Sequence, residues 1–440
     1  MSQQQLHRIV VVGGGAGGLE LVTQLGDKLG RTGKAQIILV DRNQTHIWKP
    51  LLHEVAAGSL DPNSQQLDYA AQALWHGFEF HCGELIGLNR AQKVITIGPF
   101  LSDTGEALLP ERELAYDILV LALGSKTHFF GVPGAEENTI ALDTVQQAER
   151  FRRALMAVCM KTQTALDKGA GHPQVNLAII GAGATGVELS AELRNTARIL
   201  GAYGLHKLDG FHDINITLIE AGPRILPALP EKLSSTTQKL LNELGIQVST
   251  SDPVAEIKPN LILTKSGREM PFDLAVWAAG IKAPPVLAEL DGLAVNRIAQ
   301  IEVNASLQSK SDVNIFALGD CAACVWPEKN TQVPPRAQAA HQQASFLYKA
   351  ILCRLEGKPL AIFHYRDFGS LVSLGDYSAV GSLMGGLISR SMFIEGVFAR
   401  LMYISLYRMH FMALHGVMRT VLDVLAQRLR KSTLPKVKLH

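Results

Sequence analysis

The chain has 440 residues, enough for two or three domains that each bury a core. Its 42 lysine and arginine residues nearly balance 40 aspartate and glutamate residues, which excludes a basic surface over the whole protein, and we expect no nucleic-acid partner. Five unevenly spaced cysteines and no signal-peptide pattern predict a reducing compartment and a fold without structural disulfides. No uncharged apolar run reaches roughly 18 residues, so we expect any membrane contact to be peripheral.

The first predicted element is a glycine-rich fingerprint that follows a run of β-forming residues. Gly13 is expected to make the turn from strand to helix, Gly15 to admit a pyrophosphate, and Gly18 to let the helix pack on the sheet. The next predicted strand, at 37–40, ends in Asp41, where a carboxylate can accept a hydrogen bond from a ribose 2′-OH.

A second fingerprint of the same design comprises Gly181, Gly183 and Gly186. The strand that follows it ends in Glu220, after a stretch at 201–213 that we interpret as an inserted loop. Two fingerprints, each with strand, helix and acid in order, predict two bound dinucleotides.

Two similar segments close the nucleotide-binding domains. Residues 116–124 and 272–280 each run from an aromatic residue and an aspartate through a buried apolar strand to a glycine, Gly124 or Gly280. The stretch 168–173 is rich in glycine and resembles a hinge. We therefore expect an α/β protein with two Rossmann-like dinucleotide-binding domains, the second inserted in the first. The expected division is 6–165 with 284–385 for the first domain, 166–283 for the second, and 386–440 for a C-terminal region.

Cys321 and Cys324 form a C-x-x-C pair directly after Gly319 and Asp320. The spacing is typical of redox dithiols, but we expect the pair at the start of a late helix, as two packed small residues. The fourteen histidines show no metal-binding spacing, so we predict no metal. Packing or surface positions are expected for His53, His341, His410 and His415.

The segment from about 393 to 425 is rich in apolar residues but too charged to span a membrane. On a helical wheel, 417–430 separates an apolar face from a polar one. The apolar face comprises Val417, Met418, Val421, Leu422, Val424, Leu425 and Leu429. Basic residues suited to anionic headgroups follow at Arg428, Arg430, Lys431, Lys436 and Lys438. A C-terminal amphipathic helical membrane anchor fits this pattern, and so does a helix packed on a core or on a second subunit.

Three motifs make the resemblance to a known family specific. They are Ala337-Gln338-Ala339-Ala340-His341-Gln342, Trp48-Lys49-Pro50-Leu51-Leu52 and Gly186-Val187-Glu188-Leu189. With the two fingerprints, they make the chain resemble the two-dinucleotide-binding flavoproteins. Within that superfamily it is similar to the bacterial type II NADH dehydrogenases, the non-pumping NADH:quinone oxidoreductases. The first motif fits the family's A-Q-x-A-x-Q quinone pattern.

The resemblance implies FAD in the first domain and NADH in the second. The FAD residues it implies are Gly13, Gly15, Gly18, Asp41, Lys49, Gly124 and Asp320. The NADH residues it implies are Gly181, Gly183, Gly186, Glu220 and Gly280. A carboxylate at Glu220 would repel a 2′-phosphate, which favours NADH over NADPH. Lys49 either contacts the flavin or caps a loop.

The same resemblance suggests three catalytic residues. Gln338 and Gln342 lie four apart on one helical face, where they either hydrogen-bond quinone carbonyls or lie on a solvated surface. Glu188 either orients the nicotinamide or relays protons, or is a favourable charge in the first turn of a helix.

The implied activity is FAD-dependent oxidation of NADH with two-electron reduction of a membrane quinone. The implied location is the cytoplasmic face of the inner membrane, and the family expectation is a homodimer. Two alternatives stay open. A sulfide:quinone oxidoreductase needs widely separated cysteines such as Cys159 and Cys353, although both fall in predicted helices and suit packing. A flavoprotein of the apoptosis-inducing type instead uses slow flavin reduction to switch a binding surface.

Overall fold

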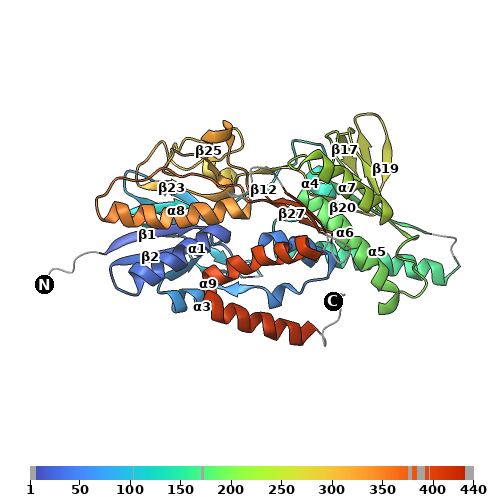
Figure 1. Cartoon of the computed structure of the whole chain (residues 1–440), viewed down its shortest axis with the longest axis horizontal. Coiled ribbons are helices and arrows are strands. Elements are labelled where there is room, and N and C mark those ends of the chain that lie inside the picture. Colours follow the sequence, from blue (N-terminus) through green and yellow to red (C-terminus); the bar gives the residue numbers. More distant parts are fainter. Residues whose placement is uncertain are drawn as a thin grey trace.

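Two five-stranded parallel sheets organise the molecule (Figure 1). The computed structural model describes residues 6–102, 104–169, 173–374, 379–383, 392–395 and 397–431. The first sheet has the order β23-β11-β1-β2-β5 and the second the order β13-β20-β14-β15-β16. The first comprises β1 (His7–Val12), β2 (Ala35–Asp41), β5 (Glu79–Cys82), β11 (Ile118–Leu121) and β23 (Ile315–Ala317). The second comprises β13 (Ile140–Ala141), β14 (Val175–Ile180), β15 (Ile214–Ile219), β16 (Ile246–Ser249) and β20 (Leu274–Trp277).

The strands of the second sheet all lie between β11 and β23 in the sequence, so this unit is inserted in the first. Residues 9–12 and 177–180 are buried, as expected for parallel strands covered on both faces. Helices α1 (Ala16–Leu25) and α6 (Ala184–Leu200) follow β1 and β14, and α8 (Ala337–Leu355) packs against α1. The other helices of these units are α2 (Leu52–Ala57), α3 (Tyr69–His76), α4 (Ala135–Asn138), α5 (Val145–Asp167) and α7 (Glu231–Glu243).

Smaller antiparallel sheets surround the two large ones. The three-stranded ones combine β6 (Leu85–Asn89), β7 (Val94–Ile97) and β10 (Arg112–Ala115), or β17 (Val254–Lys258), β18 (Leu261–Thr264) and β19 (Glu269–Pro271). Two-stranded antiparallel pairs are β3 (Thr45–His46) with β4 (Leu67–Asp68), β8 (Phe100–Leu101) with β9 (Ala107–Leu109), β12 (Lys126–Thr127) with β21 (Ile281–Lys282), and β25 (Val325–Trp326) with β26 (Thr331–Gln332). The pair β22 (Ile301–Glu302) and β24 (Ala322–Ala323) is parallel.

The boundary expected at residue 166 is wrong for two elements. Strand β13 pairs with β20 of the second sheet. Helix α5 buries Phe151, Leu155 and Cys159 in the core that also holds the strands of that sheet. Strand β13 therefore belongs with the second unit by its backbone pairing, and α5 packs on that unit in a core that it shares with Leu52 and Val55 of α2.

The boundary expected at residue 386 would divide one antiparallel sheet. Strands β27 (Gly369–Ser373), β28 (Ala379–Leu383) and β29 (Met392–Glu395) form a single antiparallel sheet. Its backbone pairing joins residues on both sides of that position.

The cysteine pair does not begin a helix. Cys321 ends a short 3-10 turn (Gly319–Cys321), and Cys324 lies between β24 and β25. Both are buried free thiols, and burial raises the pKa of each to about 11. These features are those of packed, unreactive cysteines, as the sequence predicted. The prediction that the pair begins a helix was wrong.

The last helix, α9 (Val397–Lys431), is interrupted at Gly416, whose φ of 76° and ψ of 167° are not helical. Before the break, Leu414 belongs to the core of the first unit. Within the described residues, no helix combines the length and the apolar character that crossing a membrane demands.

Candidate cofactor and active site

A cavity of about 1870 Å³ lies where the carboxyl ends of the strands in the two sheets meet α8 and α9. It contains most of the residues expected at the site. Of the predicted set, the lining includes Gly13, Gly15, Asp41, Lys49, Gly124, Gly183, Glu188, Asp320, Gln338 and Gln342. The predicted residues Gly18, Gly181, Gly186, Glu220 and Gly280 lie outside the lining.

The first glycine loop forms a cradle between β1 and α1. Gly13 has a φ of +105°, and a side chain there would collide with the carbonyl oxygen of Ala122. A side chain at Gly18 would collide with the carbonyl oxygen of Gly13. Gly15, by contrast, has open space where a Cβ would stand and borders the cavity at the start of α1. The loop therefore offers free room beside a helix N-terminus, which suits a pyrophosphate.

The second glycine loop repeats this geometry between β14 and α6. Gly181 has a φ of +104° and lies against the backbone of Ala279, while a side chain at Gly186 would meet the carbonyl oxygen of Gly181. Gly183 has open space at its Cβ position and borders the cavity. Both loops thus fit a dinucleotide phosphate group in the same way.

The two acids at the strand ends each hold their own loop. One carboxylate oxygen of Asp41 accepts from the backbone N–H of Gly14 at 2.7 Å. One carboxylate oxygen of Glu220 accepts from the backbone N–H of Ala182 at 2.8 Å, and the other accepts from Gly222 at 2.8 Å. Burial raises the pKa of Asp41. Through these hydrogen bonds, the two carboxylates orient the glycine loops.

Two further residues hold the first loop, and sequence reasoning missed both. The carbonyl oxygen of Gly14 accepts from the Tyr69 hydroxyl at 2.7 Å and from Nδ1 of His46 at 2.9 Å. Since Asp41 accepts from the Gly14 N–H, both backbone polar groups of Gly14 are held by side chains. A side chain at Gly14 would collide with the Tyr69 ring. The extra glycine in Gly13-Gly14-Gly15 was the one sequence signal of this close packing.

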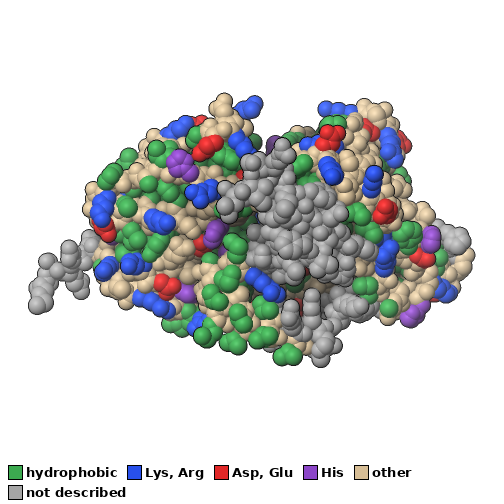
Figure 2. Space-filling view, viewed as in Figure 1, with side chains coloured by type: hydrophobic (Ala, Val, Ile, Leu, Met, Phe, Trp, Pro, Cys, Tyr) green, Lys and Arg blue, Asp and Glu red, His purple; other side chains and the backbone are tan. Residues whose placement is uncertain are grey.

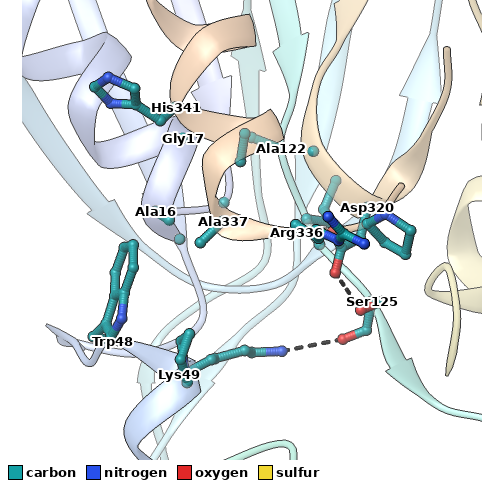
Figure 3. A pocket seen from close by; sticks show the side chains of 18 of the residues that line it. Ala16, Gly17, Trp48, Lys49, Ala122, Ser125, Asp320, Arg336, Ala337 and His341 are labelled. Atoms are coloured by element: carbon teal, nitrogen blue, oxygen red, sulfur yellow. Dashed lines mark hydrogen bonds between the residues drawn. The ribbon is translucent and has the colours of Figure 1, made fainter. Parts of the chain in front are cut away.

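A chain of polar contacts crosses the cavity from Lys49 to Asp320 (Figure 3). The Lys49 ammonium donates to the carbonyl oxygen of Ser125 at 3.1 Å, and the Ser125 hydroxyl donates to the Asp320 carboxylate at 2.7 Å. Burial raises the pKa of Asp320, while the Ser125 hydrogen bond and the Lys49 charge oppose that rise. Gly124 adjoins Ser125 and lines the same wall. The contacts bring together three segments that are far apart in the sequence.

Gln338 and Gln342, in the first turns of α8, both bind the backbone of 366–369. The Gln342 amide donates to the carbonyl oxygen of Arg366 at 2.8 Å and accepts from the Arg366 N–H at 2.9 Å. The Gln338 amide donates to the carbonyl oxygen of Gly369 at 3.0 Å and accepts from the N–H of Phe368 at 3.3 Å. The two side chains therefore hold this segment against α8 beside the cavity.

Glu188 is buried in α6 and binds the continuation of the same segment. Its carboxylate accepts from the backbone N–H of Ser373 at 3.0 Å, and its other oxygen lies 3.7 Å from Nδ1 of His53. Burial lowers the pKa of His53 to about 4, so that ring stays neutral near pH 7. All three predicted catalytic residues thus contact 366–373, a relationship that their sequence positions do not reveal.

Gly280 lies between β20 and β21, with a φ of +65°, against the ring of Phe130. Cys159 is fully buried in α5, and burial raises its pKa to about 12. Cys353 lies in α8 outside the cavity lining. No group of His, Cys, Asp and Glu within the described ranges has a geometry suited to a metal ion.

Comparison with known proteins places this site in a family. The family model described as pyridine nucleotide-disulphide oxidoreductase matches residues 7–344. The chain is 45% identical to the type II NADH:quinone oxidoreductase of Haemophilus influenzae, covering 99% of this chain and 100% of that one. It is 27% identical to the Staphylococcus aureus protein of the same name, over 87% of this chain and 91% of that one.

Solved structures share the fold. NDH2 from Plasmodium falciparum in complex with NADH matches with a TM-score of 0.81 at 17% identity, covering 99% of this chain and 100% of that one. The sulfide:quinone oxidoreductase of Aquifex aeolicus matches with a TM-score of 0.71 at 19% identity, over 93% and 92% of the two chains. Because the family model covers most of the chain and the 45% identity extends over nearly all of it, the chain belongs to the type II NADH:quinone oxidoreductases, within the pyridine nucleotide-disulphide oxidoreductases.

Proposed function

We propose that this enzyme oxidises NADH and passes two electrons, through FAD, to a membrane quinone, without pumping protons. The observation that carries the proposal is that two glycine cradles of the same geometry meet in one cavity, which the A-Q-x-A-x-Q segment of α8 also borders. When bound, FAD supplies the hydride and electron chemistry. The protein residues position the reactants and shield them from water.

We assign FAD to the first unit and NADH to the second. The open Cβ positions at Gly15 and Gly183, each at a helix N-terminus, suit the two pyrophosphates. The residues proposed to form the FAD site, by contact or by shaping the loop, are Gly13, Gly15, Gly18, Asp41, Lys49, Gly124 and Asp320. Those proposed to form the NADH site in the same way are Gly181, Gly183, Gly186, Glu220 and Gly280. With the strand pairing taken into account, the first unit takes 6–125 and 284–368, and the second takes 126–283.

Gln338 and Gln342 are proposed to act on the quinone, and their hydrogen bonds refine that proposal. The Gln338 amide donates to both Asp367 and Gly369. The Gln342 amide donates to Arg366, and within the described residues its second N–H has no acceptor. We therefore assign the quinone carbonyl contact to Gln342, and the positioning of 366–369 chiefly to Gln338.

Glu188 is proposed to position the nicotinamide side of the cavity. Its carboxylate is buried, borders the cavity, and binds the backbone of β27 at Ser373. A buried carboxyl group held in this way keeps a fixed geometry, which both orientation of a ring and proton transfer demand.

The second half of α9 is proposed to bind the membrane surface. Its apolar side chains face solvent, including Met418 at 79% and Leu422 at 60% exposure. Leu74 and Trp75 of α3 are also exposed, and Trp75 contacts Arg419 of α9. Figure 2 shows hydrophobic side chains gathered along the lower edge of the molecule, where this half of α9 lies in Figure 1. An exposed apolar surface beside basic residues suits anionic lipid.

We propose that the enzyme binds the cytoplasmic face of the inner membrane, where cytosolic NADH and membrane quinone are both accessible. The basic residues at the end of the sequence, from Arg428 to Lys438, suit anionic headgroups by their charge. Lys436 and Lys438 lie outside the described residues. A homodimer is proposed on the family expectation.

Anaerobic stopped-flow mixing of the purified protein with NADH, then with a short-chain ubiquinone, tests the activity. We expect rapid bleaching of the flavin band and rapid recovery. Bleaching by sulfide but not by NADH would contradict the proposal in favour of a sulfide:quinone oxidoreductase. Slow bleaching with a persistent charge-transfer band would instead favour a redox-dependent binding flavoprotein.

A further inference from the structure

The C-terminal helix reaches the first glycine loop through a buried pair of histidines. Nε2 of His410, on α9, lies 3.2 Å from Nε2 of His46. Nδ1 of His46 contacts the carbonyl oxygen of Gly14 at 2.9 Å. His46 and His410 are both about 5% exposed or less, so both rings are largely removed from solvent.

The chemistry of these atoms gives the chain of hydrogen bonds a direction. A carbonyl oxygen only accepts, so His46 carries its proton on Nδ1. Burial lowers the pKa of His46 to about 4, so the ring is neutral near pH 7 and its Nε2 is an acceptor. His410 must then donate from Nε2, and burial keeps it neutral too, with a pKa of about 2.

Neighbouring contacts fix His410 in this place. Its ring lies 4.3 Å from the Trp48 ring, with 32° between their planes, beside Lys49 on the cavity wall. One turn later, Leu414 is buried in the core of the first unit. The stretch of α9 from His410 to Leu414 therefore packs into the first unit, while the half after Gly416 exposes apolar side chains.

We propose that His410 is a positioning residue for FAD. Through His46 it holds the Gly14 carbonyl, and so keeps the start of α1 beside the cavity, where its N–H groups would meet a pyrophosphate. The first half of α9 is then part of the FAD site, in addition to carrying the proposed membrane contact. This inference rests on the proposed function, because it takes FAD as the occupant of the first loop.

The test measures the rate of FAD release from the full-length holoenzyme, followed by the fluorescence of free flavin after dilution. His410→Phe keeps a ring against Trp48 but removes the donor, and we expect release to become roughly tenfold faster. His410→Gln keeps an N–H donor and should restore most of the retention. The matched control is His415→Phe on the same helix, because His415 contacts Trp75 and Phe411 instead of the loop. It should release FAD at the wild-type rate.

His410→Met, a flexible side chain without a donor, replaces His410→Phe if that variant does not fold. Wild-type release from the donor-lacking variant would overturn the inference, and so would equal acceleration in His415→Phe or no rescue by His410→Gln. Failure of the proposed function looks different, because the wild-type protein would then bind no FAD or would not be reduced by NADH.

Discussion

His341 and Glu20 form a hydrogen-bonded pair that joins α8 to α1 at the cavity wall. Nδ1 of His341 lies 2.8 Å from a carboxylate oxygen of Glu20, whose side chain is 1% exposed. Gln24 donates to the other oxygen at 3.0 Å. Because the imidazole donates a hydrogen bond to Glu20 and its positive charge is attracted by that carboxylate, the pair favours the protonated ring, and the pKa of His341 is raised.

That pair predicts a pH dependence of stability. A group whose pKa is higher in the folded state stabilises the fold fully below its unfolded pKa, and loses this contribution as pH rises through its folded pKa. We therefore expect the wild-type protein to lose stability relative to His341→Gln from about pH 6.5 upward. The measurement is the urea midpoint of both proteins across that range. The difference between them cancels the opposite contributions of His46 and His53, whose pKa values burial lowers. A difference that does not vary with pH would contradict the prediction.

Replacing Gln342 should separate the two half-reactions. Gln342→Ala removes both hydrogen bonds to the backbone of Arg366 and the proposed contact to the quinone. We expect kcat/KM for quinone to fall roughly tenfold to a hundredfold, since the quinone contact is lost together with the two hydrogen bonds that hold Arg366 beside it. The rate at which NADH bleaches the flavin should be unchanged, because the second glycine loop is untouched. Cys353→Ser, on the same helix but outside the cavity, is the control and should leave both rates at the wild-type value. Equal losses in both half-reactions would show that Gln342 acts on the whole fold.

Replacing Glu220 should weaken NADH binding and reduce the preference for NADH over NADPH. In Glu220→Ala, the N–H groups of Ala182 and Gly222 lose their acceptor, and a negative charge disappears from the proposed ribose site. We expect KM for NADH to rise about five- to thirtyfold with a smaller change in kcat, and the ratio of activity with NADPH to that with NADH to increase. Steady-state kinetics with both nucleotides measure this. Glu231→Ala, an exposed residue at the start of α7, is the control. An unchanged KM for NADH would contradict the assignment of NADH to the second unit.

The extent to which the sequence predicts this molecule depends on how local each interaction is. Gly13, Gly15 and Gly18 were predictable because the turn from strand to helix imposes its demands within a few residues. The clamp on Gly14 was not, because Tyr69 is 55 residues away and His46 is 32 away, and only the fold brings them together.

Short elements limited the domain assignment for a related reason. Strand β13 has only two residues, too few to show a periodicity, so its pairing with β20 could not be anticipated. Gln338 and Gln342, expected on one helical face, both lie in α8 and line the cavity. Their hydrogen bonds to 366–369 depend on a loop with no sequence signal of its own.

If the second half of α9 binds the membrane, one negative charge placed on its apolar face should weaken that binding. Leu422→Asp places a carboxylate in the middle of the apolar face, where insertion into anionic lipid costs both desolvation and repulsion. We expect binding to vesicles of anionic phospholipid to weaken at least tenfold, with flavin reduction by NADH unchanged. Leu108→Asp is the matched control, since Leu108 is 57% exposed and Leu422 60%, but Leu108 lies on the β9 hairpin. Cosedimentation of the full-length proteins with vesicles measures the difference. If both variants bind like the wild type, or if both lose binding equally, the second half of α9 is not the contact. Loss confined to Leu422→Asp would identify the apolar face of α9 as the part of the enzyme that meets the lipid.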